Sequence, residues 1–166
     1  MTLRDRCAVL FVLPVLLSAG CRQADGPLPT PNQNVQDDLS DISKDLTYVA
    51  TGYDPSASTD LAYDLRKYVT QESAAPAVEE LSRRAATVVA NTKLPEQTAQ
   101  RLAHNLWLTV AAQEMSERQV EALQNDTQSL LMSIGVQDTQ AEQVAAQVGE
   151  VQRVSTRRVR RWYEWF

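Results

Sequence analysis

Apolar residues recur at helical spacing along most of the chain, beginning at residue 35. The first set is separated by four, three, four and three positions, which places its members on one face of a helix: Val35, Leu39, Ile42, Leu46 and Val49. Gly52, Asp54 and Pro55 follow directly and are typical of a helix end. The pattern therefore predicts a first amphipathic helix that begins at Val35 and ends before Gly52.

Further stretches with the same periodicity predict more helices. They are expected to open near Ser58, at Pro76, at Pro95, and at two capping-box patterns that begin at Ser116 and Thr139. The helix that opens near Ser58 is expected to fade near Ser73. Residues 102–112 are apolar at eight of eleven positions, so the fourth helix is expected to be central. No stretch alternates as a half-buried strand does, and the sequence predicts an all-α domain over residues 35–166, an antiparallel bundle of five or six helices.

The end of the sixth helix combines arginine with aromatic residues. If this helix runs from Thr139 to about Trp165, it is about nine residues longer than the fifth, a surplus of roughly 13 Å. We expect this overhang to be the partner-binding site, formed by Arg157, Arg158, Arg160, Arg161, Trp162, Trp165 and Phe166. The alternative is that the aromatic side chains close the bottom of the bundle while the arginines pair with acidic residues.

The chain starts with a short, net-positive segment and an unbroken apolar run over residues 7–17. This run is shorter than the ~20 apolar residues that a bilayer requires, and it is typical of a secretory signal. The junction Ser18-Ala19-Gly20-Cys21 resembles the lipobox of bacterial lipoproteins. The resemblance implies that residues 1–20 are removed and that Cys21 carries the lipid. Ordinary cleavage after Gly20, which would leave a free thiol, is the alternative.

Residues 21–34 are polar, include three prolines and show no apolar period, so they predict a flexible tether between the lipid and the helical domain. A tether of this length reaches roughly 20 Å. In families with a lipoprotein sorting system, an aspartate after the cysteine resembles a signal for retention in the inner membrane. Arg22 stands there instead, so the expected location is the periplasmic side of the outer membrane.

Charge is unevenly distributed along the expected mature chain. Without Arg4, Arg6 and Asp5, the 16 basic and 21 acidic residues become 14 and 20, a net charge of −6. Residues 153–166 hold five arginines and one glutamate, so residues 21–152 carry −10. An acidic body argues against nucleic acid as a partner, because phosphate binding needs a basic surface.

Residue types that catalyse reactions or bind metals are scarce. His104 is the only histidine, and Cys7 and Cys21 are the only cysteines, which excludes zinc sites built from His and Cys and a Cys-His nucleophile. Asp37, Asp41 and Asp45 follow one face of the first helix and could bind a divalent cation, but a solvated face is the preferred interpretation. We expect no metal, no cofactor and no enzymatic activity.

These features favour a lipid-anchored, non-enzymatic module of the cell envelope that docks an envelope protein or lipid headgroups. The alternative is a periplasmic chaperone-like or envelope-stress binder of unfolded clients. Glutamine-rich helix surfaces over residues 119–147 are similar to those of Spy-type periplasmic chaperones. An exposed, concave apolar face would favour the chaperone, whereas a closed core with one aromatic end would favour docking.

Overall fold

The computed structural model describes the backbone of residues 33–112 and 115–163 and the side chains of residues 35–112 and 115–155. Within these ranges the chain forms helices and no strands, which confirms the predicted all-α bundle. The six α-helices are α1 (Gln33–Thr51), α2 (Ala57–Arg66), α3 (Ala75–Val89), α4 (Glu96–Ala111), α5 (Glu117–Ser133) and α6 (Asp138–Tyr163), and a short 3-10 helix, η1 (Glu72–Ala74), precedes α3.

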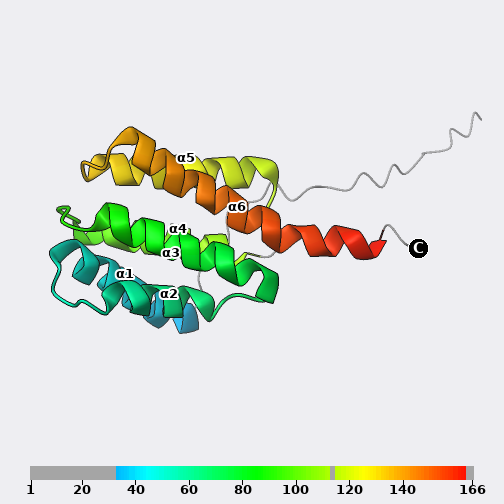
Figure 1. Cartoon of the computed structure of the whole chain (residues 1–166), viewed down its shortest axis with the longest axis horizontal. Coiled ribbons are helices and arrows are strands. Elements are labelled where there is room, and N and C mark those ends of the chain that lie inside the picture. The colour runs from blue at the N-terminus through cyan, green and yellow to red at the C-terminus, as the bar shows by residue number, and fades with distance from the viewer. Residues whose placement is uncertain (1–32, 113–114, 164–166) are drawn as a thin grey trace, which may run out of the picture.

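Consecutive helices run in opposite directions, as Figure 1 shows. Each helix packs against two neighbours in a closed ring with the order α1, α2, α3, α6, α5, α4 and back to α1. Contacts across the ring join α4 to α6, α4 to α2, and α1 to α3. Short connections link antiparallel neighbours, except that the connection from α3 to α4 joins two helices that are not adjacent in the ring.

The central position expected for the fourth helix is confirmed. α4 contacts four other helices, α1, α2, α5 and α6. Every residue from Asn105 to Val110 is buried, as a helix that is apolar nearly all round requires. Around α4 a continuous apolar core takes side chains from all six helices, with Ile42, Leu81 and Val148 each fully buried.

Several helix ends follow the residues that predicted them. Ser116 and Gln119 form the expected capping box at the start of α5, where each side chain accepts a hydrogen bond from the backbone N–H of the other residue. Gly135 follows α5 with a φ of +88°, a left-handed conformation that favours glycine.

Two predicted helix ends are wrong. α6 begins at Asp138 and not at a cap on Thr139, because the carbonyl of Gln137 accepts the first backbone hydrogen bonds of the helix. The Asp138 carboxylate accepts a bond of 2.8 Å from Gln128 Nε2 of α5. α2 ends at Arg66 and does not reach Ser73. Beyond it the backbone tightens into i to i−3 bonds.

No helix in the described part of the chain combines the length and the apolarity needed to cross a bilayer.

Candidate functional site

The most distinctive feature of the bundle is the length of its last helix. α6 has 26 residues and its antiparallel neighbour α5 has 17. At ~1.5 Å per residue, the surplus of nine corresponds to roughly 13 Å. Figure 1 shows the last, red part of α6 running past the ends of the helices beside it.

Inside the body α6 is held firmly up to residue 155. Val148 and Val151 are fully buried, and Gln152 is only 2% exposed. The amide of Gln152 donates to two carbonyls at the C-terminal end of α4, those of Thr109 at 2.6 Å and Ala112 at 3.1 Å. The last described side-chain contact is a bond of 2.6 Å that Gln71 Nε2 donates to the carbonyl of Ser155.

The residues predicted for partner binding lie beyond this last contact. The α6 backbone carries Arg157, Arg158, Arg160, Arg161 and Trp162, whose side chains lie outside the described residues. Trp165, Phe166 and the predicted lipid site Cys21 also lie outside the described residues. The structure places these arginines on one continuous helical backbone.

The surroundings of Gln71 connect this end of α6 to the beginning of α1. Three residues before Gln71, the Tyr68 hydroxyl donates a hydrogen bond to Asp38, in the second turn of α1. The ring of Tyr68 packs edge-on against Trp107 of α4, with 6.2 Å between ring centroids. Burial and the bond to Asp38 raise the pKa of Tyr68 above its usual range, so the phenol stays protonated. The first turns of α1 and the last body turn of α6 therefore lie at the same end of the bundle.

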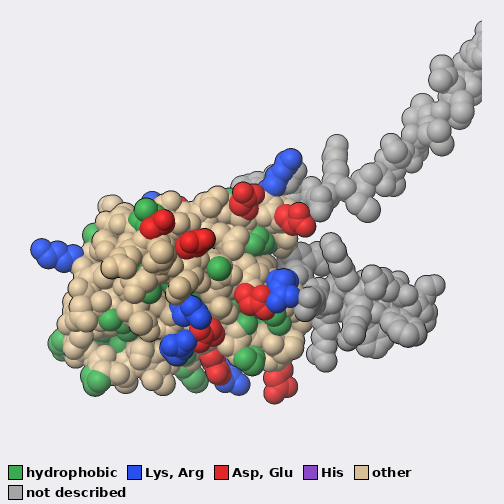
Figure 2. Space-filling view, turned by 45° about the horizontal axis from the view of Figure 1, so that its top comes forward, with side chains coloured by type: hydrophobic (Ala, Val, Ile, Leu, Met, Phe, Trp, Pro, Cys, Tyr) green, Lys and Arg blue, Asp and Glu red, His purple; other side chains and the backbone are tan. Residues whose placement is uncertain are grey.

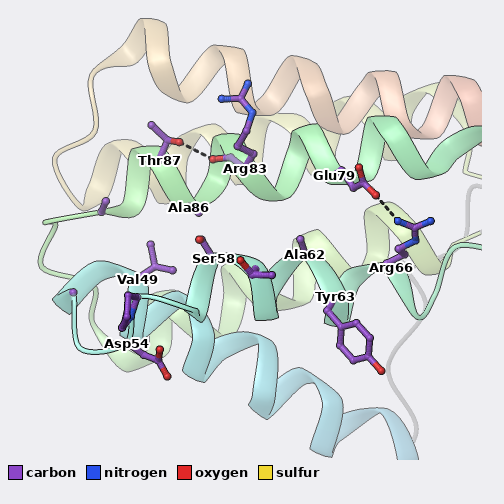
Figure 3. Close-up of a pocket in the computed structure, with 14 residues that line it drawn as sticks. Val49, Asp54, Ser58, Ala62, Tyr63, Arg66, Glu79, Arg83, Ala86 and Thr87 are labelled. Atoms are coloured by element: carbon purple, nitrogen blue, oxygen red, sulfur yellow. Dashed lines mark hydrogen bonds and ion pairs between the residues drawn. The ribbon is translucent and has the colours of Figure 1, made fainter.

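A groove that the sequence did not predict lies between α2 and α3 (Figure 3). It is open, has a volume of about 770 Å³ and is lined mainly by small side chains such as Ser58, Ala62 and Ala86. An ion pair between Arg66 of α2 and Glu79 of α3 spans it, as Figure 3 shows. Its other cation, Arg83, pairs with Glu80 at 2.7 Å. Because both cations are already paired, the groove presents no strong recognition element for a charged ligand.

The aspartates of α1 differ in their surroundings. Asp37 and Asp41 are exposed, in line with the solvated face that we expected. Asp45 departs from that expectation, because it is half-buried and its Oδ2 makes no hydrogen bond within the described residues. Burial, together with the negative charges of Asp64, Asp60 and Asp41, raises its pKa to about 7. Across the described residues, no three His, Cys, Asp or Glu side chains are grouped so as to hold a metal ion.

His104 has a structural setting within α4. Its ring stacks on that of Trp107, with 5.9 Å between ring centroids. The neighbouring Asn105 donates to Asp126 at 2.8 Å and to Thr127 at 3.2 Å. His104 thus belongs to a packed helix interface.

Comparison of the chain with protein-family models, with curated proteins and with solved structures finds no match. Because helical bundles serve many unrelated functions, the fold alone does not indicate one. The function must be argued from the surfaces and ends just described.

Proposed function

We propose that this chain is a lipid-anchored, non-enzymatic docking module of the bacterial cell envelope, which binds its partner through the C-terminal end of α6. The observation that carries the proposal is the length of α6, which has 26 residues against 17 in α5 and runs past the ends of the helices beside it (Figure 1). The segment that continues holds four arginines and Trp162. Arginine and tryptophan are enriched where proteins bind partners or membrane interfaces.

The described surface supports docking over the binding of unfolded clients. Its exposed large hydrophobic residues are Tyr53, Tyr63 and Met132, which belong to three different parts of the fold. On the face drawn in Figure 2, hydrophobic side chains lie singly or in small groups among polar ones. A chaperone for unfolded clients would need a broad apolar face, whereas single exposed hydrophobic residues are ordinary on any surface.

The direct test is crosslinking from within the cell. A photoreactive residue replaces Trp162 in the full, anchored chain, and a second version carries it at Gln140, an exposed position at the opposite end of α6. We expect strong adducts from position 162 and few from position 140. The adducts should disappear when the four arginines at 157, 158, 160 and 161 are changed to glutamate.

A third variant controls for the groove between α2 and α3. Ala62→Leu adds bulk to its lining and should leave the adducts from position 162 unchanged. Equal adduct formation from positions 140 and 162, or loss of adducts in the Ala62→Leu chain alone, would contradict docking through α6.

A further inference from the structure

α2 is the shortest of the six described α-helices and lies between two different kinds of neighbour. It buries three side chains, Ala57, Leu61 and Leu65. On one side it packs against α1, and on the other it faces α3 across the open groove shown in Figure 3. The first contact brings like charges together, and the second leaves space, so the two sides of α2 hold it unequally.

The contact with α1 brings acidic side chains of both helices together. Asp45 of α1 is half-buried, and its Oδ2 has no hydrogen-bond partner within the described residues. Burial and the negative charges of Asp64, Asp60 and Asp41 raise its pKa to about 7. We call these four residues the aspartate seam. When all four are ionised, the two carboxylates of α1 and the two of α2 repel each other between the helices.

The cations beside the seam compensate it only in part. Lys44 of α1 lowers the pKa of Asp45, but the aspartates and burial outweigh it. Lys67, at the end of α2, pairs with Asp64 at 2.7 Å. Asp64 nevertheless remains the largest of the charges that raise the pKa of Asp45. The seam therefore keeps an excess of negative charge.

Charged groups on the other helices packed against α1 have partners elsewhere. Arg101 of α4 pairs with Asp126 of α5 at 2.6 Å, and His104 of α4 stacks on Trp107. The charged side chains of α3 pair with one another or with α2, in the ion pairs Arg83–Glu80, Arg84–Glu80 and Glu79–Arg66. The balance of charge at the seam is thus set by α1 and α2.

On its other side α2 has room to move. The groove of about 770 Å³ separates it from α3, and the ion pair of Arg66 with Glu79 that spans the groove is half-exposed. Exposed ion pairs contribute little to stability. The chain just after α2 is held more firmly, because Tyr68 donates a hydrogen bond to Asp38 and packs against Trp107. The N-terminal part of α2 can therefore swing about this end.

We propose that α2 is a pH-dependent wall of the groove, which moves away from α1 and toward α3 when Asp45 is ionised. With Asp45 protonated, the seam loses one of its four charges, α2 lies on α1, and the groove is open. With all four aspartates ionised, repulsion moves the N-terminal part of α2 into the groove and narrows it. This movement does not involve α6, so it stands apart from the docking proposed above.

The test is the electron paramagnetic resonance of a spin label in the full chain at about pH 5 and about pH 8. The label is attached through Ser58→Cys, which lines the groove from α2, and the spectrum of the labelled chain without this added cysteine is subtracted. Ser129→Cys, at an exposed position of α5, gives the reference label. From pH 5 to pH 8, we expect the label at 58 to lose mobility and accessibility to dissolved oxygen, while the label at 129 stays constant.

Two variants assign the effect to the seam. Asp45→Asn should abolish the pH dependence at position 58, whereas Asp37→Asn, the same change at an exposed position of α1, should preserve it. A label at 58 that does not respond to pH, or that responds equally in the Asp45→Asn chain, would overturn the proposal. A label that becomes more mobile and more accessible at pH 8 would show that α2 leaves the bundle, which also contradicts a narrowing groove.

Discussion

Asp45 makes the packing of α1 against α2 testable through pH. Its carboxyl is half-buried, Oδ2 has no hydrogen-bond partner within the described residues, and burial with nearby aspartates raises its pKa from 3.8 to about 7. Lys44 opposes this increase without cancelling it. Because the folded pKa lies above the unfolded one, the folded state binds this proton more tightly. The free energy of unfolding should therefore fall as pH rises from about 4 to about 7.

The size of this effect follows from the two pKa values. The difference between a folded pKa of about 7 and an unfolded pKa of 3.8 corresponds to a decrease of at most ~4 kcal/mol in the free energy of unfolding at high pH. Asp45 keeps some contact with water, and screening weakens charge effects at such sites, so we expect ~1–2 kcal/mol. Replacing the carboxyl with an amide of the same shape removes the charged form altogether. Asp45→Asn should therefore raise the free energy of unfolding by ~1–2 kcal/mol at about pH 8 and change it little at about pH 4.

The assay is urea unfolding followed by circular dichroism across this pH range. Asp37→Asn is the matched control, because it makes the same charge change at an exposed position of the same helix. The free energy of unfolding of the Asp37→Asn control should equal that of the unmodified chain at every pH. If both variants shift stability equally at all pH values, the effect is one of net charge, and the described burial of Asp45 is wrong.

Three further predictions concern packing and processing. A Cβ at Gly149 would lie 2.5 Å from Gln124 Nε2 and displace the bond of that amide to a backbone carbonyl. Gly149→Ala should therefore raise the free energy of unfolding little by itself, but by ~1 kcal/mol in a Gln124→Ala background. A double-mutant cycle in urea measures both effects. Gln152→Ala leaves the carbonyls at the end of α4 without their buried donor, so it should lower the free energy of unfolding by ~1–3 kcal/mol. No change in this free energy would mean that water replaces the amide. Intact mass spectrometry of the membrane fraction should find a chain that starts at Cys21 with acyl groups, and an unmodified thiol in a soluble product would contradict lipidation.

The bundle was predictable because its signals are local. The spacing from Val35 to Val49 and the capping box of Ser116 and Gln119 each lie within one helix, and each matches the structure. The early end of α2 was not predictable in this way. Tyr68 turns out of the helical path and bonds to Asp38, 30 positions earlier in the chain, and helical periodicity contains no information about such a contact.

The candidate site was predictable in part for the same reason. The excess length of α6 follows from periodicity, and the structure gives 26 residues. Asp45 could not be separated from Asp37 and Asp41, because all three share one face of α1 and only the position of α2 determines which of them is covered. The groove depends on small side chains, such as Ala62 and Ala86, that line it from two helices. Alanine at helical spacing also occurs in fully packed interfaces, so this signal does not distinguish a groove from a core.

Truncation after Thr156 tests most directly whether the end of α6 docks a partner or closes the bundle. The last described buried side chains, Val151 and Gln152, lie before this point, so the truncated chain keeps every described core residue. We predict a free energy of unfolding within ~1 kcal/mol of the full chain, together with loss of the partners that the full chain crosslinks in cells. A loss of several kcal/mol, as expected when buried aromatic side chains are removed, would show that the segment closes the bundle and would contradict docking.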